Sequence, residues 1–543
     1  MPVNRGEGNA GKATLAISEG CAGFCSFCAE SFARKPYREN PSESALAEAR
    51  RLKAETGADK IDLFSFNFNM HRDFYRLIEG LGSLFSEIGL KSQRFDSIAE
   101  DPALIEVEKA LGKSVFTCGL EGISDRLRRF LNKNLSEAQV RKSIETLVAA
   151  SVREIKVFLI ATAREQREDL DEWTRLLSWI AGLRTPLGKQ VRFVFSVTPL
   201  VRFPHTPLEF EPAPGLERAR EAVTQIVNAT KAAGFECRAA ASAEESLFCD
   251  MLVRAPSPAV YEAFRDSVLE SKFVYDREVS ESAYRLFMKK LSAAGVDPEA
   301  LRAAYSPERN AVAPWARLDL GISRKYLEHQ YAMNSSWKEA SPDPSLLCGK
   351  GRPHPDRQAI ESLKRHIAEV RKDARPVSLA ISLGDRWLGV PREYPALLVA
   401  RALMAAEGAL VPLYRGYVSS FWEDSPEGDA PLFGKDILTL SFSGQGSAYL
   451  SSRKEPFWQS INAALSSESI SVKGPAASPA ALGCTLMMEG PFDINAEWLL
   501  RNGLKHTYAK DGEGRASYQF SKDALKKGII ESLGVERLAD GSF

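Results

Sequence analysis

The chain has 543 residues, 44% of them hydrophobic and 26% charged, which is the composition of a globular protein with room for several domains. Lysine plus arginine equals aspartate plus glutamate at 71 each, so a dominant nucleic-acid or anionic-membrane surface is not favoured. No apolar run approaches the roughly 20 residues of a membrane helix, and the polar, glycine-rich start lacks the apolar core of a signal peptide. We therefore expect a cytoplasmic protein that has no membrane segment.

Short apolar runs alternate with amphipathic segments over residues 14–240. The apolar runs predict six strands, at residues 13–18, 60–66, 91–98, 114–120, 154–161 and 191–198. Helices are predicted at residues 42–55, 71–88, 102–111, 136–150, 169–183 and 216–233. Strands that alternate with helices at this spacing indicate right-handed βαβ units and a parallel sheet. The predicted fold is α/β, a partial (β/α)6 TIM-like barrel over residues 14–240 that follows a flexible arm at residues 1–13.

The pattern changes twice after the predicted barrel. Residues 241–375 read as a mostly helical extension. Residues 376–543 read as an α+β domain, which we predict to consist of two ferredoxin-like halves. Its strands are expected at residues 377–382, 436–442, 448–451 and 484–489, and its helices at residues 395–406 and 456–465. No motif in this last domain indicates a chemistry, so its role is not predicted.

Three of the eight cysteines, Cys21, Cys25 and Cys28, lie in a CxxxCxxC motif directly after the first predicted strand. An iron–sulfur cubane has four irons and normally takes four thiolates. Three thiolates on one loop leave the fourth iron open, and an open position is how a metal site binds a substrate. We interpret the three cysteines as the metal ligands and the catalytic core of a [4Fe–4S] site. A zinc site would need a fourth cysteine or histidine, and the closest histidine is His71.

The motif, with Phe27 just before its last cysteine, resembles that of the radical S-adenosylmethionine (SAM) superfamily. Residues 119–125 (GLEGISD) with 131–133 (LNK), and residues 204–208 (PHTPL), resemble a subgroup related to cobalamin-dependent and methylthio-transferring members. The similarity runs, with gaps, from about residue 14 to about residue 345. It implies that SAM binds the open iron and is cleaved reductively to a 5′-deoxyadenosyl radical for C–H activation. It also implies that Phe27 contacts the SAM adenine.

The chain departs from the subgroup in several places. We find no DxHxxG motif of a cobalamin-binding domain before the cysteines, so cobalamin is possible but is supported by no motif. The "GGE" end of the second strand is replaced by residues 65–69 (SFNFN), and the "GLPxE" end of the fifth by residues 161–165 (ATARE). Two alternatives therefore stay open. One is a cobalamin-assisted methyltransferase whose cobalamin is held by another chain, and the other is a non-catalytic iron–sulfur or zinc protein.

Three further residues are candidates for binding SAM. Glu121, at the end of the fourth predicted strand, is expected to hold the SAM amino group or ribose, or else to be an acid that favours a helix start. Ser92 and Arg94 are expected to point together into the barrel, where Arg94 would pair with the SAM carboxylate, unless it is a surface arginine. The expected partners are a reductant such as flavodoxin or ferredoxin and an unidentified substrate, which is a polypeptide, a small molecule or RNA.

Overall fold

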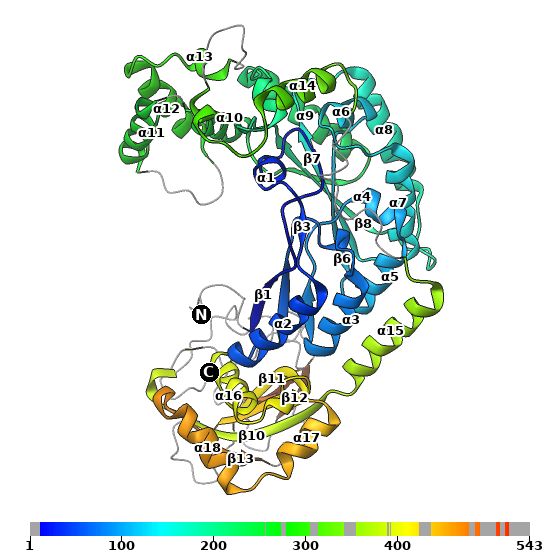
Figure 1. The fold of residues 1–543 in the computed structure, drawn as a ribbon, viewed down its shortest axis with the longest axis vertical. Helices are drawn as coiled ribbons and strands as arrows, with labels where there is room; N and C mark the ends of the chain where they lie inside the picture. Colours follow the sequence, from blue (N-terminus) through cyan, green and yellow to red (C-terminus); the bar gives the residue numbers. More distant parts are fainter. Residues whose placement is uncertain are drawn as a thin grey trace.

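The computed structural model describes residues 11–255, 257–272, 279–303, 313–340, 354–387, 390, 393–422, 436–476, 484–488, 506–510 and 516–520. Of the predicted arm at residues 1–13, residues 1–10 lie outside the described residues. Figure 1 shows the described chain as an open C, with helices at one end, a parallel sheet in the middle and a second α/β lobe at the other end. No helix of the described chain has both the length and the apolar character needed to span a membrane.

The middle of the molecule is a curved sheet of parallel strands covered by helices on one face. One part pairs β1 (Lys12–Ala16), β4 (Lys60–Phe64) and β5 (Glu87–Gly89). The other part pairs β6 (Val115–Glu121), β7 (Glu154–Ala161), β8 (Arg192–Pro199) and β9 (Glu236–Ala239). A parallel bridge between Gln93 and Cys118 connects the two parts. The α/β class and the partial barrel are confirmed, with β9 as a strand that we did not predict.

Helices cover one face of this sheet because alternate strand residues are apolar. The main ones are α2 (Ser42–Thr56), α3 (Phe74–Leu84), α5 (Ala103–Ala110), α7 (Glu137–Ala149), α8 (Arg167–Gly182) and α9 (Leu216–Ala232). Ile61 and Leu63 of β4 pack with α2 and α3, while Val157 and Leu159 of β7 pack with α7 and α8. Because successive side chains of a strand point to opposite faces, the other strand residues form a face without helices.

The helical extension begins with four helices that share a core. These are α10 (Ala243–Val253), α11 (Pro258–Ser271), α12 (Glu281–Ala293) and α13 (Pro298–Arg302). Next, α14 (Arg324–Ser335) returns to the cysteine end of the sheet. Finally, α15 (Arg357–Lys372) packs along α3 and α5, where Ile360, Leu363 and Ile367 join their core. The extension therefore contacts the parallel sheet domain at two places.

The last lobe has the strand order of a ferredoxin-like unit. Its elements are β10 (Arg375–Leu383), α16 (Glu393–Ala406), β11 (Tyr414–Trp422), β12 (Asp436–Phe442), α17 (Gly444–Ser451), α18 (Glu455–Leu465) and β13 (Ile470–Pro475). The antiparallel order β11-β12-β10-β13 is that of a split βαβ unit. A separate antiparallel sheet contains β14 (Cys484–Met488), β16 (Ala516–Phe520) and β15 (His506–Lys510). Most of the predicted second ferredoxin-like half lies outside the described residues.

Two predicted strands are wrong. The third strand was placed at residues 91–98, but the strand is β5, and residues 95–100 form helix α4 (Phe95–Glu100). Asp96 in the first turn favours that helix start, where backbone N–H groups are unpaired. The strand predicted at residues 448–451 lies in α17, whose N-cap Ser443 accepts a hydrogen bond from Gly446 N–H. A capping side chain therefore favours the helix in α17, whereas in α4 the N-cap residue makes no side-chain cap and Asp96 acts from the first turn.

Candidate active site

The three clustered cysteines lie on one tight loop at the end of the sheet. The loop leaves the short strand β2 (Ser18–Glu19) and enters α1 (Ala29–Ala33), with Cys28 as the N-cap residue. Gly20 opens it at φ 74°, and a Cβ there would overlap the carbonyl oxygen of Arg34, so only glycine fits. Cys28 N–H donates to the Cys25 carbonyl at 3.0 Å, which closes the second half of the loop. Cys25 is buried, whereas Cys21 and Cys28 are partly exposed.

Gly23 leaves a space between two of the thiols. A Cβ on Gly23 would lie 3.4 Å from Cys21 Sγ, 3.8 Å from Cys25 Sγ and 3.3 Å from Arg94 Nη1. Glycine therefore keeps the region between these groups free of side-chain atoms. In the described chain, no three His, Cys, Asp or Glu side chains are arranged to hold one metal ion. That observation concerns a single metal ion. In a cubane, each thiolate binds a different iron, so the thiols need not converge on one point. The donor set, three thiols on one loop, fits a [4Fe–4S] cluster.

Two N–H donors point at the Cys21 sulfur. Asn67 Nδ2 lies 3.0 Å from Cys21 Sγ, and the backbone N–H of Gly23 lies 3.3 Å from it. Asn67 comes from the loop after β4, in the segment that replaces the expected "GGE" end. Hydrogen bonds to cluster sulfurs are one of the means by which a protein sets a reduction potential. Burial, followed by the neighbouring Cys25, raises the pKa of the Cys28 thiol to about 11, so a metal must displace its proton.

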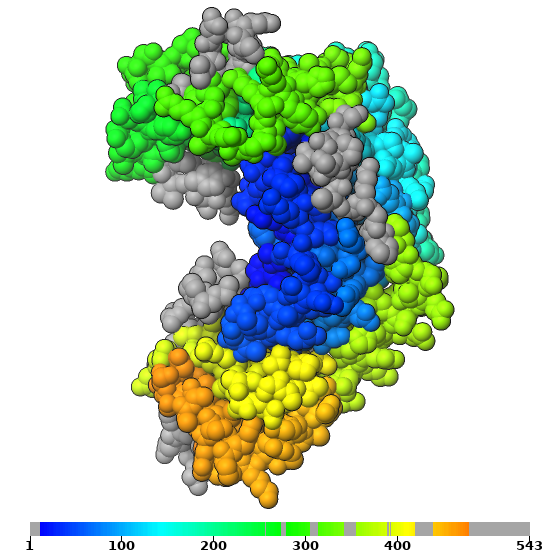
Figure 2. Space-filling model, in the orientation of Figure 1, coloured from blue at the N-terminus to red at the C-terminus, as the bar shows by residue number. Residues whose placement is uncertain are grey.

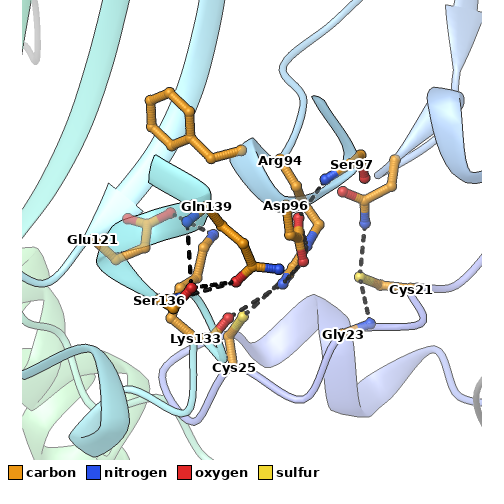
Figure 3. A network of polar contacts seen from close by, with 12 residues as sticks. Cys21, Gly23, Cys25, Arg94, Asp96, Ser97, Glu121, Lys133, Ser136 and Gln139 are labelled. Atoms are coloured by element: carbon orange, nitrogen blue, oxygen red, sulfur yellow. Dashed lines mark hydrogen bonds and ion pairs between the residues drawn. The ribbon is translucent and has the colours of Figure 1, made fainter. Parts of the chain in front are cut away.

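Arg94 reaches the cysteines from the start of α4. Its Nη1 lies 3.9 Å from Cys25 Sγ, and its Nε and Nη2 bind the Asp96 carboxylate at 2.8–3.0 Å. Figure 3 shows Arg94 and Asp96 between Cys21 on one side and Cys25 with Lys133 on the other. Burial opposes ionisation of Asp96, but Arg94 outweighs it and lowers the pKa of the carboxyl. Arg94 is therefore a fixed, buried cation and not a surface arginine.

Glu121 and Lys133 form a second buried pair beside Cys25. Glu121 ends β6 with a left-handed φ of 66°, and its Oε1 lies 3.2 Å from Lys133 Nζ. A non-glycine residue in this conformation costs about 1–3 kcal/mol, and such strain clusters at functional sites. Burial disfavours the charged form of Lys133, yet Glu121 and Cys25 prevail and raise its pKa. Lys133 also lies in the LNK stretch, but sequence reasoning did not single it out as a site residue.

A third cation lies under the loop. Lys35 Nζ donates to the carbonyl oxygens of Cys21 and Gly23 and lies 3.9 Å from the centre of the Phe24 ring. Burial lowers the pKa of Lys35, although the three cysteines act in the opposite direction. Cations at Lys35, Arg94 and Lys133 thus surround a loop that becomes negatively charged when its thiols ionise. No sequence signal identifies Lys35, because its role depends on backbone carbonyls.

Two asparagines from outside the loop hold its backbone. Asn132 Nδ2 donates to the Phe24 carbonyl at 2.8 Å, while its Oδ1 accepts from Ala340 N–H at 3.1 Å. Asn334, at the end of α14, accepts from Ser26 Oγ at 2.6 Å and is fully buried. Ser26 N–H also donates to the Leu131 carbonyl at 2.9 Å. The helical extension therefore contacts the cysteine loop directly.

The other residues considered from the sequence, Phe27, Ser92 and His71, have different surroundings. Phe27 is partly buried and packs against the cluster of Phe130, Leu131, Leu200 and Leu208. Ser92 is exposed in the segment that is not a strand, so it does not share the setting of Arg94. The contacts of Phe27 and Ser92 with SAM stay predictions. His71 is a structural residue, because its Nε2 lies 2.9 Å from the Asn40 carbonyl and its Nδ1 accepts from Asp73 N–H.

The other cysteines are apart from the site. Cys118 and Cys237 are buried in the core between the sheet and its helices, and Cys249 is a partly exposed residue of α10. Cys348 lies outside the described residues, and of Cys484 only the backbone in β14 is described.

Comparison with known proteins finds similarity over the first part of the chain. Residues 15–177 match the model of the radical SAM superfamily. An uncharacterised protein of Methanocaldococcus jannaschii is 26% identical over 208 residues, which are 38% of this chain and 44% of that protein. A tRNA-2-methylthio-N(6)-dimethylallyladenosine synthase of Methylobacillus flagellatus is 26% identical over 241 residues, 42% of this chain and 52% of that enzyme. The chain thus spans about half the length of these relatives.

Among solved structures, the chain is similar to the radical SAM methyltransferase TsrM from Kitasatospora setae, solved with cobalamin and a [4Fe–4S] cluster. The TM-score is 0.30 at 15% identity, over 52% of this chain and 60% of that one. The cobalamin-dependent radical SAM enzyme OxsB has the same TM-score at 13% identity, over 66% of this chain and 58% of that one. Members of the family use a [4Fe–4S] cluster and SAM. Over residues 15–177, therefore, the chain is similar to the radical SAM superfamily and carries a domain of that kind.

Proposed function

We propose that this chain binds a [4Fe–4S] cluster through Cys21, Cys25 and Cys28 and cleaves SAM reductively to activate a C–H bond of its substrate. The observation that carries the proposal is the single loop that bears the three thiols, with two N–H donors pointing at the Cys21 sulfur. When bound, the cluster and SAM supply one-electron reduction and a 5′-deoxyadenosyl radical. The protein's own contribution is to position these groups and to exclude water.

The buried charges next to the thiols have defined tasks in this proposal. Arg94 places a cation 3.9 Å from Cys25 Sγ and is itself fixed by Asp96, so it balances the charge of the thiolates. The Glu121–Lys133 pair presents a carboxylate and an ammonium at the end of β6, where the SAM amino group and ribose are expected. Phe27 offers its ring for the adenine. The bidentate pairing with Asp96 leaves Arg94 less free to bind the SAM carboxylate than the sequence suggested.

Anaerobic reconstitution tests the proposal. The purified chain is loaded with iron and sulfide, reduced in the presence of SAM and assayed for 5′-deoxyadenosine. We expect about four irons per chain and 5′-deoxyadenosine, and we expect both to be lost in Cys21→Ala, Cys25→Ala and Cys28→Ala. Cys249→Ala is the matched control, because Cys249 is a partly exposed thiol on α10. A chain that binds four irons but never cleaves SAM would support the non-catalytic alternative.

The relatives supply a second candidate outcome for the same radical chemistry. One of them is named as a synthase of 2-methylthio-N(6)-dimethylallyladenosine in tRNA, so transfer of a methylthio or methyl group is the reaction class to examine first. If a separate cobalamin-binding protein takes part, this protein should modify its substrate only when the cobalamin-binding protein is added. The reductant in either case is a flavodoxin- or ferredoxin-type donor. Mass spectrometry of modified nucleosides and of cobalamin-supplemented reactions separates these outcomes.

A further inference from the structure

The face of the parallel sheet without helices carries exposed aromatic side chains. Phe64 on β4, Phe66 just after it and Phe158 on β7 are 53%, 37% and 39% exposed. Phe64 and Phe158 lie on this face because their strand neighbours pack against helices. The Phe64 and Phe66 rings are in contact, with centroids 6.4 Å apart. Exposed apolar groups that gather on one face mark binding surfaces.

This aromatic surface borders the cysteine site at both ends. Phe66 directly precedes Asn67, whose amide contacts Cys21 Sγ at 3.0 Å. Phe158 is the register partner of Gly119 on β6, and the Glu121 side chain folds back over Gly119, where a Cβ would meet it. Figure 2 shows the chain hollowed between the helices of the extension and the last lobe, with the first part of the sheet domain behind the hollow. A group bound on Phe158 would therefore lie next to the proposed radical site.

A cation lies in the same row as Phe158. The register pairs Phe158 with Ser196 on β8 and Ser196 with Arg238 on β9. Arg238 is exposed and shares the helix-free face, because the residue before it, Cys237, packs on the helix side. With about 4.8 Å between strands, Arg238 starts about 10 Å from Phe158. Ser196, which lies between them on β8, is small and only 4% exposed, so no bulky side chain of the strands separates the ring from the guanidinium.

The nearby charges on this face also favour an anion. Lys12 and Lys91 share the single carboxylate of Asp62, at 3.7 and 3.0 Å. Lys156, Arg192, Glu154 and Glu236 form a balanced chain of ion pairs. Together with Arg238, these groups carry more positive than negative charge. The chain as a whole is neutral, so this excess is local.

We propose that the helix-free face binds a substrate with a planar aromatic group and an anionic substituent, the ring against Phe158 and the anion at Arg238. This inference rests on the proposed radical SAM function and specifies its substrate class. Aromatic rings bind each other in stacked or edge-to-face arrangements, and a guanidinium binds carboxylate, sulfonate or phosphate through a pair of N–H groups. Arg238 sets the distance of the ring from the cysteines and is a specificity-determining residue.

A fluorescence titration with 8-anilinonaphthalene-1-sulfonate tests the proposal, since this probe is itself an aromatic anion. The full chain is used without iron or SAM. We expect Phe158→Ser and Arg238→Gln each to weaken probe binding about tenfold, as the loss of one good contact does. Leu187→Ser, with Leu187 76% exposed on the loop before β8, and Arg175→Gln on the outer face of α8 are the matched controls. Equal affinity in all variants would overturn the proposal. Circular dichroism checks that each variant is folded.

Competition then identifies the kind of ring. Indole-3-acetate and adenosine monophosphate are added to the chain with its probe bound. Displacement by either supports the proposal and selects between an amino-acid-like and a nucleotide substrate, while displacement by neither overturns it. Because the titration needs neither cluster nor SAM, its result does not depend on the SAM cleavage assay. Failure of one proposal is therefore distinguishable from failure of the other.

Discussion

The hydroxyl of Ser26 donates a hydrogen bond to Oδ1 of Asn334 at 2.6 Å, although 308 positions separate the two residues in sequence. Ser26 lies between Cys25 and Cys28, and Asn334 ends α14 in the helical extension. Asn334 Nδ2 in turn donates to the carbonyls of Arg129 and Lys338 at 3.2 and 3.0 Å. A residue well beyond the matched family domain thus fixes the loop that carries the metal ligands.

Asn334→Ala should loosen the cysteine loop. The variant leaves Ser26 Oγ and two carbonyls without their partner, which costs about 1–3 kcal/mol in the free energy of unfolding. We expect the reconstituted variant to lose iron faster on gel filtration. Asn462→Ala is the matched control, since Asn462 makes a similar pair of hydrogen bonds with Val472 in the last lobe. Equal iron retention in both variants would show that the Ser26–Asn334 contact does not support the cluster.

Gly23→Ala should impair cluster binding without unfolding the protein. The added methyl would lie 3.4 Å from Cys21 Sγ and 3.3 Å from Arg94 Nη1, so it would crowd two thiol ligands and the arginine beside them. We expect less than half of the parent iron content after reconstitution. Gly182→Ala, where the methyl meets nothing within 4 Å, should keep full iron content and a similar melting temperature. Normal iron binding by Gly23→Ala would contradict the position we give the cluster.

Arg94→Met should lower the reduction potential of the cluster. A positive charge near Cys25 favours the reduced, more negative state, so its removal makes reduction harder. Arg94→Lys keeps the charge but not the bidentate contact with Asp96, so its reduction potential should lie between those of Arg94→Met and the parent. Potentiometry followed by electron paramagnetic resonance measures the shift. Arg94→Met leaves the Asp96 carboxylate without its cation, which itself destabilises the protein. The double variant Arg94→Met/Asp96→Asn removes that carboxylate and so separates the effect of the missing cation from the effect of lost stability.

Asp169 should make stability depend on pH at the acid end. It pairs with Arg126 and accepts from Ser124 Oγ at 2.6 Å and Gln166 N–H at 2.7 Å. Burial raises its pKa, but Arg126 and the hydrogen bonds outweigh burial and lower it. The unfolded chain therefore binds the proton first, at about pH 4, and the contribution of Asp169 is full above that pH. It is lost as the pH falls through the lower pKa of the folded state.

Urea unfolding of Asp169→Asn measures this contribution. At pH 7 we expect the variant to be about 1–3 kcal/mol less stable than the parent, because a buried ion pair loses its charge. The difference should shrink as the pH drops from about 5 to 3. A difference that stays constant over this range would show that ionisation of Asp169 does not matter.

The parallel sheet could be predicted from sequence because its strands are short, buried and apolar. The strand predicted at residues 154–161 coincides with β7. The strand predicted at residues 91–98 is wrong because only Gln93 makes a bridge there and a helix starts at Phe95. Strand β9 was missed because its four residues lack an apolar run.

The sequence predicts the site only where residues that are close together in the sequence form it. The spacing of Cys21, Cys25 and Cys28 indicates one loop, and Arg94 lies 3.9 Å from Cys25 Sγ, while the SAM contacts expected of Arg94 and Glu121 stay predictions. Lys35 and Asn334 left no signal, because each binds the loop from a distant element through backbone groups or a single hydroxyl. Such contacts depend on tertiary packing and have no local pattern.

The central claim is that three cysteines leave one iron open for SAM, and Mössbauer spectroscopy of the 57Fe-reconstituted protein tests it most directly. The account predicts a [4Fe–4S] spectrum in which SAM shifts the signal of one iron in four, and loss of that spectrum in Cys25→Ala. A spectrum that SAM leaves unchanged, or a protein that binds zinc in place of four irons, would contradict it.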